Sequence, residues 1–137
     1  MKRRTWLLGF LALCLFLITT ASLWLRASLP QTNGETVIAG LQKPSQIIRD
    51  HYGITFIKAE KLTDGYRALG YAHAQDRLWQ MELMRRSGAG RLSEIFGSRT
   101  LAIDRFIRTL GLRKTAERSM ASLSPEVMSG LVAYAEG

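Results

Sequence analysis

The sequence contains one cysteine and two histidines in 137 residues, which excludes several kinds of site. Cys14 cannot form an internal disulfide and cannot belong to a zinc site built from several cysteine ligands. It lies in the long apolar run at the N-terminus. Because it is the single cysteine, the rest of the chain has no thiol. A cysteine-free domain is compatible with an oxidising compartment but does not require one. Cysteine usage therefore leaves the redox compartment open.

Signals for nucleic-acid binding are also missing, although the formal net charge is +8. Four of the nineteen basic residues, Lys2, Arg3, Arg4 and Arg26, flank the N-terminal apolar run. From Ala27 onward, 15 basic and 11 acidic residues leave a net charge of only +4. The sequence has no RNP-type aromatic motif, no zinc-finger spacing and no further basic run. We therefore predict that nucleic acid is not a partner.

The longest apolar run lies at the N-terminus. Three basic residues precede twenty uncharged residues at 6–25, and Arg26 closes the run. A secretory apolar region spans roughly 7–15 residues, whereas a membrane-spanning helix needs about 20. This length favours an uncleaved signal anchor in residues 1–26, with a removed signal peptide as the alternative. Either way the positive end stays in the cytoplasm. The chain is then anchored in the inner membrane facing the periplasm, or is periplasmic or secreted.

Residues 27–34 form a predicted tether, because they are rich in turn-forming residues and show no periodicity. Short runs compatible with β-strands follow at 35–38, 46–49 and 54–59. The last two flank Gly53, which can adopt positive φ, and Asp50, which is typical of a turn. The pattern predicts a short β-hairpin.

A long helix is predicted from residue 63 to about 87, with Thr63 or Asp64 as its N-terminal cap. Gly65 and Gly70 fall inside it, and each costs a helix roughly 1 kcal/mol relative to alanine. We therefore expect a close backbone neighbour that requires the missing side chains.

This helix has two apolar arcs instead of one. At about 100° per residue they consist of Ala74, Leu78 and Met81, and of Ala72, Trp79 and Leu83. A surface helix normally buries a single stripe. The pattern predicts a helix that is packed from two sides inside a larger body.

A polar stripe of His73, Asp76 and Gln80 lies between the arcs. A histidine and a carboxylate at this spacing could bind a metal or act as an acid–base pair. The interpretation we favour is a structural one: the three side chains form a hydrogen-bonded network on a buried helix face, or they simply contact water, because buried polar groups usually have structural partners. No third ligand lies at a metal-site spacing, and nothing places His51, the other histidine, nearby.

The C-terminal part is predicted to be mostly helical. Helical segments are expected at 91–96, ended by Gly97, at 100–120 with a break at Gly111, and after the cap Ser124 with Pro125 in the first turn. Glu82 and Arg86 are spaced for an ion pair within the long helix. The fold class is therefore α+β: a membrane helix, a hairpin and a helical segment. Residues 35–137 offer the strands and the central helix few partners, which predicts an incomplete domain.

Several of these segments together resemble the start of the α chain of the penicillin acylase family. They are Ile48–Gly53, Gly70–Glu82, Gly90–Gly97, Asp104-Arg105, Arg108, Leu110–Leu112 and Ala133–Gly137. The match covers about residues 28–137 in order, which makes it more specific than any single motif. One departure is Thr55-Phe56, where many members carry Pro-His, so a close substrate group is not assigned.

The resemblance implies an exported N-terminal nucleophile hydrolase with a four-layer αββα fold. Precursors of the family cleave themselves into α and β chains. The N-terminal serine of the β chain then attacks an amide carbonyl, with its own amine as base and an oxyanion hole completing the site. Substrates are small N-acyl compounds, such as β-lactam side chains, glutaryl groups and acyl homoserine lactones.

The resemblance places all of this machinery after residue 137, including the calcium ligands of some relatives. It implies no catalytic, substrate-binding or metal residue in this chain, and no activity for the fragment alone. Arg49, Asp50, 70–82 and 90–97 match as scaffold, which would pack beside the hydrolase sheet and line one side of the acyl-binding cleft. The partner is then the protein's own β chain. The alternative is a membrane-anchored, non-catalytic helical binding or assembly module.

Overall fold

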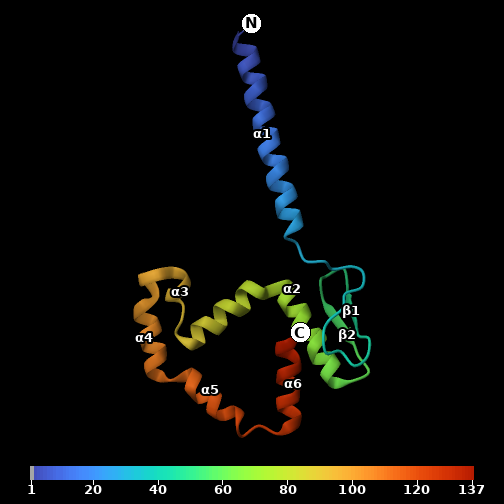
Figure 1. The fold of residues 1–137 in the computed structure, drawn as a ribbon, viewed down its shortest axis with the longest axis vertical. Helices are drawn as coiled ribbons and strands as arrows, with labels where there is room; N and C mark the ends of the chain where they lie inside the picture. The colour runs from blue at the N-terminus through green and yellow to red at the C-terminus, as the bar shows by residue number, and fades with distance from the viewer. Residues whose placement is uncertain (1) are drawn as a thin grey trace. The chain divides into compact units, whose positions relative to one another are not determined.

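The structure is a computed structural model that describes residues 2–137, with side chains from Trp6 onward. The chain forms two compact units, divided after Glu35. The first contains one long helix, α1 (Lys2–Ala27) (Figure 1). Within its segment Trp6–Ala27, an 18-residue window has a mean hydropathy of 2.2, and none of it is buried. By length and composition this segment could cross a membrane, and an N-terminal signal sequence meets the same criteria.

The second unit, Thr36–Gly137, begins with an irregular segment followed by a hairpin. Strand β1 (Gln46–Arg49) pairs antiparallel with β2 (Thr55–Lys58), so that Ile47 lies opposite Ile57. The predicted hairpin is confirmed, with its second strand slightly shorter than expected.

The turn of the hairpin is organised by Asp50. Its carboxylate accepts hydrogen bonds from the backbone amides of Tyr52, at 2.9 Å, and Ile54, at 2.8 Å. Gly53 has a φ of 80°, a conformation that glycine adopts without steric cost. Asp50 is therefore the turn residue that the sequence indicated.

The strand predicted at 35–38 is wrong. This segment is irregular, and Val37 is 99% exposed. Gly34 and Gly40 on either side of it have positive φ, which bends the chain away from an extended path. Strand propensity reflects packing on a half-buried sheet, and this segment has no neighbouring strand within the described chain.

Helix α2 (Leu62–Ala89) is the predicted long helix, but its predicted caps are wrong. Neither Thr63 nor Asp64 caps it, because the helix begins one residue earlier, after a lysine that makes no side-chain cap. Asp64 instead accepts the backbone amides of Gln42, at 3.0 Å, and Lys43, at 3.1 Å. Its buried carboxylate therefore fixes the irregular segment against α2.

A kink at Arg77 divides α2, with φ of −144° and ψ of 23° at that residue. We call residues 62–76 the first half of α2 and residues 78–89 the second half. The sequence gives no signal for the kink, because no proline or glycine lies near it. The two apolar arcs were drawn on a straight helix, so each of them is divided at this point.

The remaining helices are short. They are α3 (Ser93–Phe96), the 3₁₀ turn η1 (Gly97–Thr100), α4 (Leu101–Leu110), α5 (Leu112–Met120) and α6 (Pro125–Glu136). Gly97 and Gly111, with φ of 67° and 70°, end α3 and α4 as predicted. The hydroxyl of Ser124 accepts the amide of Val127 at 3.3 Å, which confirms the predicted cap of α6.

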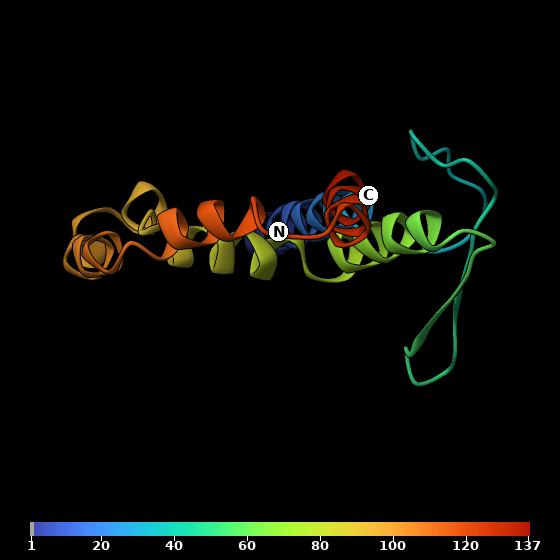
Figure 2. The ribbon, with the colours of Figure 1, turned by 90° about the horizontal axis from the view of Figure 1, so that it is seen from below.

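The helices of the second unit lie in a single layer, with the hairpin at one end of α2 (Figure 2). Helix α6 packs on α2 at Gly70, in its first half, while residues of α4 and α5 line a pocket with Gly88 and Ala89 of the second half. The buried apolar residues in the described side chains are Ala68, Ala72 and Ala133, all small. Domains normally bury large side chains between two or more layers. Small-residue packing and polar contacts therefore hold this layer together.

Candidate functional site

Helices α2 and α6 cross at very close range at Gly70. A Cβ atom there would lie 2.0 Å from the carbonyl oxygen of Tyr134 and 3.0 Å from its carbonyl carbon. Gly130 of α6 lies under the ring of Tyr66, and a Cβ on this glycine would be 3.1 Å from the ring. The prediction of a close backbone neighbour is confirmed at Gly70. It is wrong at Gly65, where the nearest atom, Cβ of Ala59, lies at 3.7 Å, an ordinary contact distance.

Arg67 ties this crossing to the irregular segment. Its guanidinium forms an ion pair with Glu136 of α6 at 2.6 Å, and its side chain is 11% exposed. The same guanidinium lies against Gly40, where a Cβ would be 2.9 Å from Cζ. Three separate parts of the chain therefore meet around the first half of α2.

The polar stripe of α2 does not converge on one point. His73 Nδ1 lies 2.9 Å from the hydroxyl of Tyr134. Asp76 forms an ion pair with Arg49 of the hairpin at 3.2 Å, and Gln80 is exposed. Each group that has a partner contacts a different element, in agreement with the structural interpretation.

His51 lies apart from the stripe, in the hairpin turn, with its ring centroid 3.7 Å from that of Tyr52. Among the residues whose side chains are described, no three His, Cys, Asp or Glu side chains are placed to hold a metal ion. Each of the two histidines therefore contacts a tyrosine, and among the described side chains neither lies in a group that could hold a metal ion.

An open cleft of about 400 Å³ lies between the hairpin turn and α2. Its lining consists of Gly53, Thr55, Leu69, Ala72, His73, Asp76, Arg77 and Met81. Thr55 carries the one hydroxyl of this lining, and within residues 6–137 no hydrogen bond joins it to His73. Nucleophilic catalysis needs a nucleophile in contact with a base. In the cleft formed by the described residues, Thr55 and His73 do not form a pair of nucleophile and base.

Asp104 joins the end of α2 to α4. Its carboxylate is 2% exposed and accepts the backbone amides of Leu92, at 2.9 Å, and Ser93, at 2.7 Å. Burial alone would raise its pKa, but hydrogen bonds from Ser93 and Leu92, with the charge of Arg108, lower the pKa below its usual value. The carboxylate is therefore held in its ionised form.

Arg108 and Gly90 complete this joint. Arg108 Nε donates to the carbonyl oxygen of Gly90 at 2.8 Å. Gly90 has a φ of 64°, and a Cβ on it would lie 2.7 Å from the carbonyl oxygen of Asp104. The glycine that ends α2 is thus required by both its conformation and its neighbours.

An ion-pair network covers the second half of α2. Glu82 accepts from Arg85 at 2.7 Å and from Arg86 at 2.6 Å, which confirms the predicted pair. Arg86 also contacts Glu94, which accepts from Arg91 at 2.6 Å. Hydrogen bonds from Arg85 and then Arg86 lower the pKa of Glu82 to about 2. Sequence spacing could not reveal the Arg86–Glu94 pair, because it crosses the break between two helices.

The segments that carry the family resemblance are also those that make these long-range contacts. Arg49 and Asp50 belong to the hairpin, 70–82 crosses α6 and borders the cleft, and 90–97 is held by Asp104. Among the described residues these side chains position backbone and helices.

Comparison with known proteins gives consistent relatives. Residues 44–137 match the family described as penicillin amidase. The chain is 44% identical over 113 residues to the penicillin acylase 2 proenzyme of Pseudomonas sp. strain SE83, covering 82% of this chain and 15% of that protein. It is 42% identical over 110 residues to the acyl-homoserine lactone acylase QuiP of Pseudomonas aeruginosa, covering 80% and 13%.

A solved structure supports the same relationship. The thermostable penicillin G acylase from Alcaligenes faecalis superposes with a TM-score of 0.62 at 30% identity, over 68% of this chain and 50% of that one. This chain therefore spans a small part of the curated relatives and half of the solved chain. The sequence match over residues 44–137 and the shared fold show that the chain belongs to the penicillin amidase family.

Proposed function

We propose that this chain is the N-terminal part of the α chain of an exported acylase, which in its complete form hydrolyses the amide bond of N-acyl substrates. The observation that carries the proposal is the match of residues 44–137 to the family, together with 44% identity to a protein named as a proenzyme. Self-cleavage of a precursor into α and β chains is part of this proposal.

The role of this chain in the enzyme is that of a scaffold. The nucleophilic serine, its amine base and the oxyanion hole belong to the β chain, which follows residue 137. In support, the described polar side chains around α2 are engaged in structural pairs such as Asp76–Arg49 and His73–Tyr134. The open cleft beside the hairpin turn is positioned by those pairs, and we assign it to the wall of the acyl-binding region.

Calcium, implied by the family resemblance, does not fit the side chains that the structure describes. The buried carboxylates Asp64 and Asp104 each accept two backbone amides, and Glu82 and Glu94 are paired with arginines. Calcium needs about six to eight oxygen ligands, several of them carboxylates, around one point. We therefore place any calcium ligands in the part of the protein after residue 137.

Two substrate classes follow from the relatives. One relative is named as a penicillin acylase and another as an acyl-homoserine lactone acylase, with similar identities of 44% and 42%. The complete protein is proposed to act on small N-acyl amides of one of these classes. For location, we propose that α1 directs export and either anchors the protein in the inner membrane or is removed.

The test is to express the complete reading frame and measure hydrolysis of a chromogenic N-acyl amide, of a penicillin and of an acyl homoserine lactone. We expect turnover of at least one by the complete protein. The matched control is residues 1–137 alone, which we expect to be inactive. Turnover by this control, lost when one of its serines is replaced, would overturn the proposal.

A second candidate is a membrane-anchored, non-catalytic helical module that binds a partner. The observation in its favour is the number of large apolar side chains exposed on the single helical layer, including Trp79 and Phe106. The two candidates differ in the gene: a stop codon directly after codon 137 supports the module, and an open frame of several hundred further codons supports the acylase.

A further inference from the structure

Helix α4 exposes an apolar stripe of Ile103, Phe106 and Leu110, which we call the α4 stripe. We propose that the α4 stripe is the surface on which the part of the acylase chain that follows residue 137 docks. This inference rests on the proposed function, because it names the partner that covers one face of the scaffold.

The stripe is exposed although its composition is that of a buried face. The three side chains are 50%, 60% and 53% exposed. Their spacing of three and four residues places them on one side of the helix, as in a helix that packs on a core. The residue that α4 buries most deeply is instead a charged one, Asp104, at 2% exposed. Large apolar side chains that gather, exposed, on one face of a helix are typical of an interaction site.

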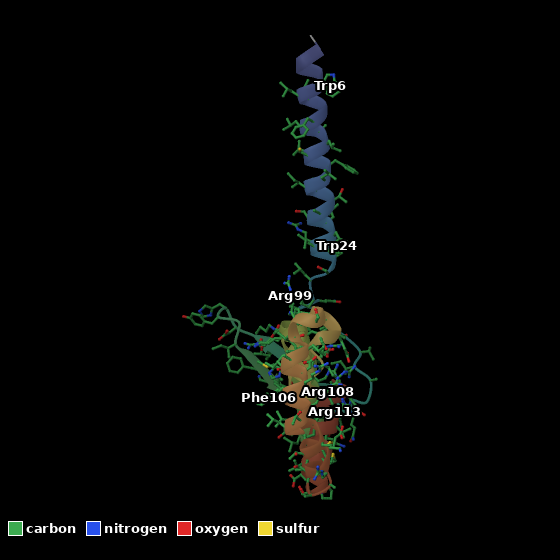
Figure 3. The ribbon with its side chains drawn as sticks, turned by 90° about the vertical axis from the view of Figure 1, so that its left-hand side faces the viewer. Trp6, Trp24, Arg99, Phe106, Arg108 and Arg113 are labelled. Atoms are coloured by element: carbon green, nitrogen blue, oxygen red, sulfur yellow. The ribbon has the colours of Figure 1, made fainter. Side chains whose placement is uncertain are left out.

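The stripe cannot turn inward within this unit. Asp104 is fixed by the amides of Leu92 and Ser93, and Arg108 is fixed by the carbonyl oxygen of Gly90. Rotating α4 to bury Phe106 would break these contacts and leave a carboxylate without its donors, which is costly for a buried group. Figure 3 views the unit from the side of α4, with Phe106 and Arg108 labelled. The cover must therefore come from outside the unit.

The occupant we infer is the remainder of the same protein. The stripe lies within the region that matches the family, and the alignments of this chain cover only 15% and 13% of the first two relatives. Most of the relatives' length is therefore available to form a second layer. A lipid surface and a second copy of this chain are the competing occupants, and the experiment distinguishes them.

The experiment measures thiol accessibility in the complete protein, with Cys14 replaced by alanine and any later cysteine likewise replaced. Ile103→Cys and Phe106→Cys test the stripe. Arg105→Cys is the matched control, since Arg105 is exposed on another side of the same helix. We expect a water-soluble maleimide to react with the stripe variants at least about tenfold more slowly than with the control, because a docked face reacts only on opening. After denaturation the rates should be equal.

Equal rates for stripe and control in the native protein would overturn the proposal. Protection of the stripe that disappears on detergent extraction would also overturn it, because the stripe would then lie on a lipid surface. Protection that disappears on dilution would overturn it as well, because the stripe would then contact a second copy of the chain. Hydroxyl-radical footprinting of Phe106 in the unsubstituted protein gives the same answer if a variant fails to fold. Absence of turnover with the stripe still protected would count against the proposed function and leave the docking surface standing.

Discussion

The two halves of α2 pack in opposite ways. The first half buries the small residues Ala68, Gly70 and Ala72, and Gly70 lies directly against Tyr134 of α6. The second half buries none of its residues, exposes Leu78 and Trp79 at 65% and 59%, and is covered by arginine–glutamate pairs. The kink at Arg77 separates them.

The comparison shows that the packing of the first half is complete within this chain, whereas that of the second half is not. Helix–helix contact at a glycine requires both backbones to be present, and Gly70 and Tyr134 supply them. A half-exposed tryptophan beside an apolar leucine has no such partner in the described residues. If the proposed function holds, the packing of the first half is complete within this chain, and the second half faces the rest of the enzyme.

The largest effect is expected from the same substitution made in each half, measured by denaturant unfolding of the complete protein. Gly70→Ala places a Cβ 2.0 Å from a backbone oxygen, and separating α2 from α6 should cost on the order of 3 kcal/mol. Gly88→Ala meets nothing within 4 Å and should stabilise the helix by up to about 1 kcal/mol. Similar effects of the two substitutions would remove the distinction between the halves.

Asp104→Asn tests the joint at the end of the second half. An asparagine amide would turn a donor toward the backbone amides of Leu92 and Ser93, so the melting temperature should fall, though less than with Gly70→Ala.

The effect of Asp104→Asn also depends on pH. The pKa of Asp104 is lowered from its ordinary value of 3.8, so its stabilisation is fully present above pH 3.8 and is lost as pH falls through the folded-state pKa. The difference between wild type and variant should therefore shrink only in acid. A difference that is constant from neutral pH into strong acid would contradict the role of the charged carboxylate.

Ser124→Ala tests the partner of the first half. Removing the hydroxyl that accepts the amide of Val127 should cost about 1 kcal/mol, the usual value for a lost helix cap. The control is Ser129→Ala, since that hydroxyl contacts only a carbonyl of its own helix, at Glu126. Equal unfolding midpoints for the two variants would show that the cap does not support α6.

The smallest effect is expected from Glu82→Gln, because the exposed ion pairs of the second half are weakened by solvent and salt. The pKa of Glu82 lies at about 2, below its ordinary value of 4.5. Its contribution is therefore present above pH 4.5 and is lost as pH falls toward 2. Thermal melts at low and high salt should show a slight loss for the variant at low salt only. A large loss at high salt would mean that the network is buried by a partner.

Features that depend on the local backbone could be predicted from the sequence. The hairpin with its Asp50 turn, the break at Gly111 and the cap at Ser124 each depend on residues within a few positions of one another. The helix cost of glycine predicted the close approach at Gly70, but the same argument failed at Gly65, whose nearest neighbour lies at an ordinary contact distance.

Features that depend on distant partners could not be predicted. Asp64 looked like a helix cap and instead binds amides more than twenty positions earlier, while Asp104 binds amides eleven and twelve positions earlier. The kink at Arg77 has no sequence signal, and the strand expected at 35–38 lacked a pairing partner. For the same reason the candidate site, His73 with Asp76, could be weighed but its partners Tyr134 and Arg49 could not be named in advance.

The proposed function makes this chain the non-catalytic front of a two-chain acylase. The most direct measurement is the intact mass of the protein purified from the complete reading frame, taken together with its turnover of an N-acyl amide. We expect two chains, the smaller containing the sequence up to and beyond Gly137, and activity only when both are present. A single uncleaved chain without turnover, or a reading frame that stops at codon 137, would contradict it.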